Sequence, residues 1–263
     1  MEIALKIVSK IRENEQFSVY IVIPMWPEGI PTSAAVQEIL FWQSQTMAMM
    51  YKLIADELEK AGLSSCYHPQ DYLNFYCLGA REPFPLKTSS ANPQTENRAL
   101  AAAQTYKRFM IYVHAKAMIV DDEYIIMGSA NINQRSMDGS RDTEIAMGAY
   151  QPFHTKAQKG HILRGQVYAY RMSLWAEHLG VLEEKFERPE SNECIKRVNK
   201  IARGNWKAFV GEKNRALHGH ILQYPFHVGK DGKVSGLPGY ESFPDVGGKV
   251  LGSSTTLPDA LTT

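Results

Sequence analysis

A histidine and a lysine stand two residues apart at the start of an apolar run, in the segment VHAKAMIVDDEYIIMGSANIN of residues 113–133. Residues two apart on an extended strand face the same side, so His114 and Lys116 are predicted to project together. An unpaired lysine is costly to bury, which places the pair at the end of a sheet, beside a cleft that admits an anion. Asn131 is expected to fold back beside them. An imidazole, an ammonium and an amide are together suited to holding a phosphate.

The complete spacing distinguishes this segment from a chance occurrence. Lys116 follows His114 after one residue, Asp121 follows after four more, and Gly-Ser-Ala-Asn follows after another six. A second His-x-Lys at residues 154–156 lies in a polar stretch and has no aspartate five residues after its lysine. We interpret that copy as solvated surface. The alternative for the first copy is a structural histidine with a lysine nearby, and the full spacing argues against it.

Three consecutive acidic residues, Asp121, Asp122 and Glu123, raise the question of a metal site. Consecutive side chains at the end of a strand point in different directions, and the sequence places no further ligand beside them. We therefore predict no metal and no cofactor bound by this chain.

The elements that must position these residues alternate between strands and long helices. We predict helices at residues 1–14, 34–60, 161–180 and 189–210, and strands at 17–25, 72–78, 107–120, 124–128 and 143–149. Ser33 is the expected N-cap of the second helix and Gly62 its stop. Residues 81–104 are predicted to form a polar loop. The hairpin around residue 121 must be antiparallel, so the predicted fold is an α/β domain with a layered mixed sheet flanked by helices.

Length and charge limit the class of protein. A chain of 263 residues, 44% of them hydrophobic, can build a substantial core. We predict a half-domain over residues 1–215, with the His-Lys motif at 114–131, and an irregular cap over 216–263. The 29 basic and 28 acidic residues nearly balance, so no global field favours nucleic acid or an anionic membrane.

The compartment is predicted from cysteine usage and from hydropathy. Three cysteines, Cys66, Cys77 and Cys194, show no metal-binding spacing, which favours buried thiols in a reducing compartment. The sequence has no window of about 18 apolar residues that would predict a membrane span. The amphipathic first helix does not resemble a signal peptide, and we expect further chain before Met1.

The His-x-Lys-x4-Asp spacing followed by Gly-Ser-x-Asn is the signature of the phospholipase D superfamily. Residues 108–152 resemble the second of the two such motifs in plant phospholipase D. PMWPEGIP, NFYCLG, WAEHLG and the terminal LPDALTT also resemble the C-terminal half of that enzyme, most of all its calcium-dependent beta, gamma and delta types. The resemblance covers essentially the whole chain and implies the fold of one phospholipase D half-domain.

The resemblance implies a role for each residue of the motif. His114 matches the histidine usually assigned the acid and base role, while Lys116 and Asn131 would bind the non-bridging phosphate oxygens. Glu144 matches the acidic residue that holds the imidazole ring. Asp121, the third letter of the motif, is counted with His114 and Lys116 as a catalytic residue by the resemblance. It is expected to tie the hairpin turn by hydrogen bonds more than to touch substrate.

The resemblance also implies a substrate and partners. Family members hydrolyse the distal phosphodiester of glycerophospholipids such as phosphatidylcholine to phosphatidic acid and a free headgroup, through a phosphohistidine. Two motifs are needed and this chain carries one, so the expected partner is an N-terminal half with the first motif, or a second copy. Cytoplasmic location, peripheral membrane association and calcium dependence of the full-length enzyme are expected, the calcium acting through a separate domain.

Two other functions remain open at this point. The chain would be a catalytically incomplete fragment if no partner supplied the second motif. It would be a superfamily nuclease or phosphodiesterase if two copies formed an active homodimer, although near-neutral charge without a basic stripe of interleaved aromatics argues against a nucleic-acid partner. Trp26 is expected either at the rim of the cleft or in the core. Arg135 and Arg141 are expected either to contact phosphate or to form surface salt bridges.

Overall fold

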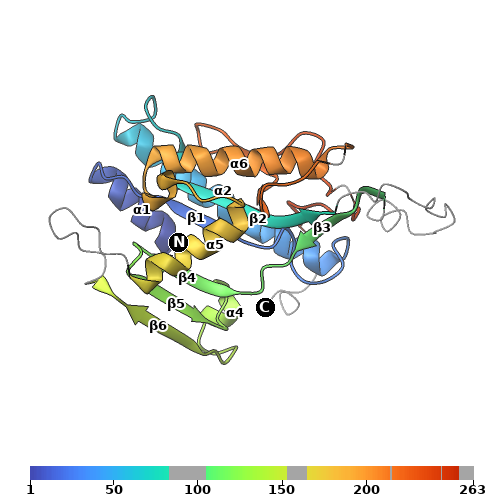
Figure 1. The fold of residues 1–263 in the computed structure, drawn as a ribbon, viewed down its shortest axis with the longest axis horizontal. Coiled ribbons are helices and arrows are strands. Elements are labelled where there is room, and N and C mark those ends of the chain that lie inside the picture. Colours follow the sequence, from blue (N-terminus) through green and yellow to red (C-terminus); the bar gives the residue numbers. More distant parts are fainter. Residues whose placement is uncertain (83–104, 153–164, 214, 244, 255–263) are drawn as a thin grey trace.

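A computed structural model of the chain describes residues 1–82, 105–152, 165–213, 215–243 and 245–254 (Figure 1). Its helices are α1 Glu2–Arg12, α2 Ala34–Lys60, α4 Gln134–Met137, α5 Gln166–Leu179 and α6 Asn192–Val210, with short 3-10 turns at Pro69–Asp71 and Glu184–Glu187. Its strands are β1 Val19–Val22, β2 Leu73–Arg81, β3 Arg108–Ile111, β4 Lys116–Val120, β5 Tyr124–Gly128, β6 Ala146–Tyr150, β7 Ile221–Gln223, β8 Phe226–Val228 and β9 Val234–Gly236.

β2 is the central strand of a four-stranded mixed sheet. β1 runs parallel to it and β3 antiparallel, while β7 pairs with it antiparallel on the other edge. Tyr76 lies between Val22 of β1 and a residue of β7, and Leu78 lies between Ile111 of β3 and a residue of β7. β1 and β3 therefore share one edge of β2, end to end.

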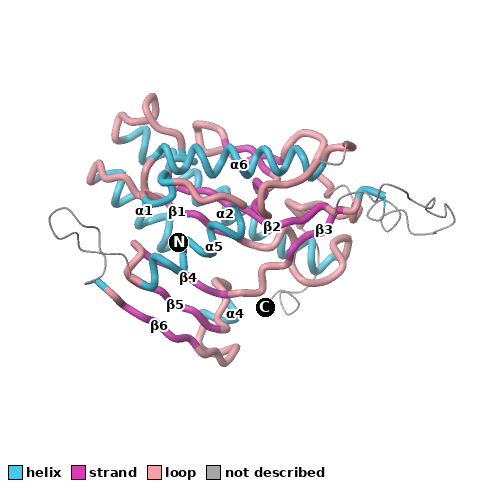
Figure 2. Tube along the Cα trace, viewed as in Figure 1, coloured by secondary structure: helices cyan, strands magenta, loops and turns pink. Residues whose placement is uncertain are grey.

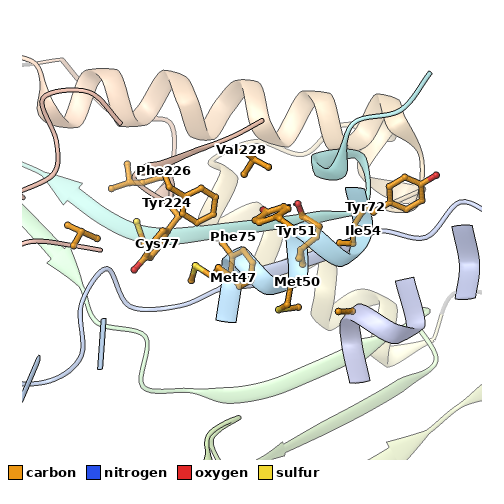
Figure 3. Close-up of a cluster of buried hydrophobic side chains, with 14 of the residues drawn as sticks. Met47, Met50, Tyr51, Ile54, Tyr72, Phe75, Cys77, Tyr224, Phe226 and Val228 are labelled. Atoms are coloured by element: carbon orange, nitrogen blue, oxygen red, sulfur yellow. Dashed lines mark hydrogen bonds between the residues drawn. The ribbon is translucent and has the colours of Figure 1, made fainter. Parts of the chain in front are cut away.

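The side chains of β2 alternate between two hydrophobic clusters, as the period of a strand requires. Leu73, Phe75 and Cys77 pack into a cluster with α1 and α2, and Figure 3 shows Phe75 and Cys77 beside Met47 and the following turns of α2. The even-numbered residues Tyr76 and Leu78 belong to a second cluster with α5 and α6. Helices on both faces bury the sheet, which is why β2 is apolar without alternation.

Two arginines from neighbouring strands hold the C-terminal end of α6. Arg81 donates to the carbonyls of Ala208 and Gly211, both at 2.6 Å. Arg108 donates to the carbonyl of Phe209 at 2.6 Å and pairs with the buried Asp245 at 2.7 Å. The last carbonyls of a helix lack partners inside the helix and carry its negative dipole, so guanidinium groups suit both needs.

The predicted single strand at residues 107–120 is wrong. The chain leaves the main sheet after Ile111, passes through residues 112–115 without regular secondary structure, and begins β4 at Lys116 in a separate sheet (Figure 2). The register gives the reason, because the place beside Tyr76 that a longer β3 would occupy is taken by Val22 of β1. His114 lies in this crossing segment between the two sheets.

The second sheet has three antiparallel strands in the order β4-β5-β6. Asp121 and Asp122 both have positive φ (52° and 58°), and the N–H of Glu123 donates to the carbonyl of Val120 at 3.1 Å. Positive φ at both central residues is the type I′ pattern that matches the twist of a hairpin. The Asp122 carboxylate then accepts two hydrogen bonds, at 2.5 and 2.7 Å, from the buried Arg171 of α5. This ion pair ties the hairpin to the body of the protein.

The remaining predictions about elements are largely confirmed. The mixed α/β architecture, the antiparallel hairpin and the helix that begins after the N-cap Ser33 are present. α6 begins after Ser191, whose hydroxyl accepts from the Cys194 N–H, and not at the predicted residue 189. α4 was not predicted. The polar loop predicted at 81–104 lies outside the described residues from 83 onward. The start of the helix predicted at 161 and the His-x-Lys copy at 154–156 also lie outside them.

The segment after residue 215 does more than cover the domain. β7 is a strand of the main sheet, and Leu222, Tyr224 and Phe226 belong to its larger hydrophobic cluster. The boundary expected at residue 215 stays a prediction. Within the described part of the chain, no helix is both long and apolar enough to cross a membrane.

Candidate active site

His114 occupies the crossing segment and is exposed to solvent. Its ring lies beside the ring of Tyr112, with the centroids 6.1 Å apart and the planes inclined by 33°. Residues 112–115 belong to neither sheet, so the position of His114 is set by β3 and β4 on either side of it. An exposed imidazole at a fixed position can reach a bound substrate.

Lys116 is the first residue of β4 and lies directly opposite Gly128 of β5. Its ammonium donates to the main-chain carbonyl of His114 at 2.6 Å. This short contact joins the two residues of the motif, and it turns the lysine toward the crossing segment. Lys116 is the half-buried member of the pair and His114 the exposed one.

The predicted cluster of His114, Lys116 and Asn131 does come together. The three residues line one open hollow of about 490 Å³ with Gly128 and Ser129. Gly128 has to be a glycine, because a Cβ there would stand 2.2 Å from the carbonyl oxygen of Ile145. The close approach of backbones lets the Gly-Ser-x-Asn loop turn back beside the start of β4.

Glu144 stands at the centre of a hydrogen-bond network behind this loop. One carboxylate oxygen accepts from Ser129 Oγ and the other from Ser136 Oγ, each at 2.5 Å. These two hydrogen bonds, followed by the charges of Lys116 and Arg135, lower the pKa of Glu144 below its usual value. Both oxygens bond to serines here, so the orientation of the imidazole by Glu144 stays a prediction.

Two serines connect Glu144 to the loop, a role that the sequence did not predict for Ser129 of the motif or for Ser136. Ser129 Oγ accepts from the N–H of Ile145 at 3.0 Å, and Ser136 Oγ accepts from the N–H of Asn131 at 3.1 Å. Ser136 is placed by the short helix α4, whose N-cap Asn133 accepts from the Ser136 N–H. An N-cap residue directly after the motif is the sequence signal that predicts this turn.

Asp121 lies at the other end of the hairpin from the hollow. β4 separates it from Lys116 by five residues, or roughly 16 Å at the rise of a strand. Its position in the turn agrees with a structural role, but the side chain that ties the turn to the body is that of Asp122. The catalytic assignment of Asp121 stays a prediction.

A second hollow of about 400 Å³ adjoins the first, and His114 lines both. Its other lining residues are Trp26, Pro27, Glu28, Gly29, Met110 and Tyr112. The ring of Trp26 also contacts that of Phe243, with centroids 5.2 Å apart, at the edge of the main core. Both expectations for Trp26 therefore hold, since one face packs on the core and the residue lines the hollow.

The arginines near the motif differ. Arg135 forms an ion pair with Asp142 at 3.2 Å, which is the surface salt bridge expected as one of its alternatives. Arg141 is exposed. Across the described residues, no group of three or more His, Cys, Asp or Glu side chains is arranged to hold a metal ion.

The residues around the hollow are of types suited to binding a phosphate and to taking part in its transfer. An ammonium and an amide around one hollow can neutralise the charge on non-bridging oxygens, and an imidazole at the rim can move a proton or attack phosphorus. The mouth of the hollow is open, and the described part of the chain brings a single histidine to it. A mechanism with two histidines therefore needs another surface opposite His114.

Comparisons with known proteins agree with this chemistry. A family model described as phospholipase D matches residues 1–252. The whole chain is 61% identical to phospholipase D delta and 54% identical to phospholipase D gamma 3, both of Arabidopsis thaliana, and 54% identical to phospholipase D alpha 1 of Zea mays. It spans 30% to 32% of the length of these relatives.

Proposed function

The chain belongs to the phospholipase D family, and we propose that it supplies half of an active site that hydrolyses the distal phosphodiester of glycerophospholipids. The products would be phosphatidic acid and a free headgroup, with phosphatidylcholine as one substrate. The observation that carries the proposal is the meeting of His114, Lys116 and Asn131 around one hollow. A phosphate placed there would contact a cation, an amide and an imidazole together.

The proposed reaction has two steps. In the first, a histidine from the other half attacks phosphorus while His114 donates a proton to the departing headgroup oxygen, which leaves as an alcohol. In the second, His114 takes a proton from water, whose oxygen attacks phosphorus and releases phosphatidic acid and the free histidine. Lys116 and Asn131 stabilise the charge on the non-bridging oxygens in both steps. Glu144 would turn toward His114 once the other half is bound.

We propose that the partner is an N-terminal half that carries the first motif, with a second copy of this chain as the competing arrangement. The three-stranded sheet beside the hollow supports a docked partner, because it leaves large apolar side chains in solvent. The strand register places Met127 and Met147 on one face of the sheet and Met118 and Tyr150 on the other, and the exposed Ile145 directly precedes β6. Large exposed apolar side chains that share a face, as Met127 and Met147 do, are typical of interaction surfaces. The whole enzyme would act at the cytoplasmic surface of membranes, and its calcium dependence would reside outside residues 1–263.

A headgroup-release assay on phosphatidylcholine tests the proposal. Purified chain would be measured alone and after mixing with the first-motif half of a longer relative, such as phospholipase D delta, with transfer of the phosphatidyl group to a primary alcohol as a second readout. We expect turnover only in the mixture. Turnover by the chain alone that rises with the square of its concentration would instead establish the homodimer. Turnover that is first order in the chain alone would refute the two-histidine mechanism.

His114→Ala is the variant that tests the residue assignment. In the mixture we expect it to lower turnover by about 10² to 10⁴-fold, the usual contribution of a general acid and base. His114 is exposed, so the midpoint of thermal unfolding should stay unchanged. His227→Ala, at an exposed histidine on β8, is the matched control and should keep full turnover. If His114→Ala kept activity within a few-fold, the histidine would not be catalytic.

A further inference from the structure

Four basic residues form a straight row along α6. Lys196, Lys200, Arg203 and Lys207 follow one another at steps of four, three and four residues, which places them on one face of the helix. All four are exposed. The row is roughly 16 Å long at the rise of an α-helix, and no Asp or Glu occurs between residues 194 and 211. Figure 1 shows α6 along the upper border of the molecule.

These cations lack the acidic partners that other cations of the protein have. Lys10, Arg12, Lys52 and Arg188 each form an ion pair, and Arg197, on the flank of α6 itself, pairs with Glu183. Among the described residues, none of the four cations in the row takes part in an ion pair or a side-chain hydrogen bond. Acidic and basic residues nearly balance over the whole sequence, so this row is a local separation of charge.

A glycine lies within the row. Gly204 is one turn after Lys200 and one turn before Lys207, beside Arg203, in the interior of the helix. Glycine weakens a helix interior, and it is usually kept where something must approach the backbone closely. Nothing lies within 4 Å of the place a Cβ would occupy, so no part of the described protein explains it. Three cations therefore surround a bare stretch of helix surface that opens to solvent.

We propose that this row is a binding surface for anionic phospholipid headgroups on a membrane, with a headgroup phosphate seated over Gly204 between Lys200, Arg203 and Lys207. The apolar face of α6 is occupied by the core, where Ile195, Val198 and Phe209 are buried, so the helix cannot insert. Binding is then electrostatic and reversible, and it is screened by salt.

A lipid surface fits better than nucleic acid. Single-stranded nucleic acid is bound by cations together with exposed aromatic rings on which bases stack. The aromatic residues of α6, Trp206 and Phe209, are buried under the helix and point away from the row. The choice of lipid also rests on the phospholipid substrate proposed above. The charge row itself does not depend on catalysis, so its binding can be measured without turnover.

Vesicle co-sedimentation of the purified chain tests the surface. We expect the chain to pellet with vesicles of phosphatidylcholine plus phosphatidic acid, but not with phosphatidylcholine alone, and to be released at high salt. Each basic residue near an anionic surface contributes about five-fold in affinity, so Lys200→Glu with Lys207→Glu should abolish binding. The matched control is Lys230→Glu with Lys233→Glu, which makes the same charge change at exposed lysines outside the row and should retain most binding.

Gly204→Ala tests the seat itself. Alanine is a better helix former, so thermal stability should rise, while affinity for the anionic vesicles should fall at least two-fold because the methyl group blocks close approach. Unchanged affinity would rule out a headgroup phosphate bound over Gly204. An equal loss of vesicle binding in the two double variants would rule out the α6 row as the binding surface. If a DNA oligonucleotide bound as tightly and with the same sensitivity, the partner would be nucleic acid. Headgroup release in the two-half mixture, assayed on soluble short-chain substrate, reports separately on the proposed function.

Discussion

The two sheets of this protein differ in how far the chain itself covers them. In the four-stranded sheet, eight of the nine residues of β2 are buried, and helices lie on both faces. In the three-stranded sheet every residue of β6 is exposed, and Ile125 is the buried residue among β4, β5 and β6. The four-stranded sheet is packed into hydrophobic clusters on both faces, whereas the three-stranded sheet presents side chains that no described part of the chain covers.

The motif residues lie where these two sheets meet. His114 is in the segment that leaves the covered sheet, and Lys116 begins the uncovered one. A rigid core therefore fixes one end of the hollow, and the other end stays accessible to a partner. The difference between the sheets agrees with the proposal that this chain supplies one half of an active site and needs a second surface to complete it.

The covered sheet should be the more sensitive to the loss of one side chain. Arg108→Ala leaves the buried carboxylate of Asp245 without its ion-pair partner and removes hydrogen-bond donors to the last carbonyls of α6. Removing one partner of a buried ion pair typically costs about 3–5 kcal/mol, and we expect a loss of this size in the free energy of unfolding by urea. Arg135→Ala breaks the exposed pair with Asp142 and should cost about 0–1 kcal/mol. Equal losses in the two variants would contradict the comparison.

A smaller and more local effect is expected at the Asp122–Arg171 ion pair, which joins the hairpin of the three-stranded sheet to α5. Asp122→Asn removes the charge that accepts two hydrogen bonds from Arg171, at a cost of about 2 kcal/mol. Native-state hydrogen exchange should show faster exchange for the amides of β4, β5 and β6, with β2 unchanged. Asp56→Asn, in the exposed pair with Lys52, is the control and should leave all of these rates alone. Uniform acceleration in both sheets would mean that they unfold as one unit.

Local signals in the sequence were enough to predict much of this arrangement. Ser33 and the long apolar pattern after it predicted α2, and the apolar run around an acidic turn predicted the hairpin. The spacing of the motif predicted that His114, Lys116 and Asn131 would meet, which the shared hollow bears out.

What failed depends on contacts between distant parts of the chain. The break between β3 and β4 arises because β1, nearly ninety residues earlier, occupies the edge of β2 that a longer strand would need. The pairing of Asp122 with Arg171 joins residues 49 positions apart. The serines around Glu144 follow from how the loop folds back, and residue types alone do not specify that path.

Charge on the uncovered sheet should change association more than stability. Met147 of β6 is 76% exposed, so Met147→Asp should alter the free energy of unfolding by no more than about 0.5 kcal/mol. We expect the same change to reduce self-association of the isolated chain in sedimentation velocity, and to weaken its activation by a first-motif half. Leu182→Asp, at a residue that is 60% exposed outside this sheet, should change neither property. Equal association of all three proteins would show that the uncovered sheet is not an interface.

The smallest expected effect concerns whether the hydrogen bonds of Glu144 order the loop beside the hollow in the isolated chain. Glu144 has its pKa lowered because its carboxylate accepts from Ser129 and Ser136, so the folded state binds that proton less tightly than the unfolded state. This contribution to stability is present above the usual pKa of 4.5 and is lost as pH falls through the lower folded value. Ser136→Ala removes one of the two hydrogen bonds and should move the pKa of Glu144 upward, as followed by the carboxyl carbon shift in an NMR titration.

The matched control for this variant is Ser140→Ala, because that hydroxyl donates to Asp138 and not to Glu144. Ser136→Ala should also speed exchange of the Asn131 amide, which donates to the same hydroxyl. Both changes in the isolated chain would mean that the Gly-Ser-x-Asn loop is ordered by Glu144 and its serines before any partner arrives. An unchanged pKa and an unchanged Asn131 amide would mean the reverse, with order in this region imposed by the docked half. The uncovered sheet would then differ from the core in its own stability as well as in its exposure.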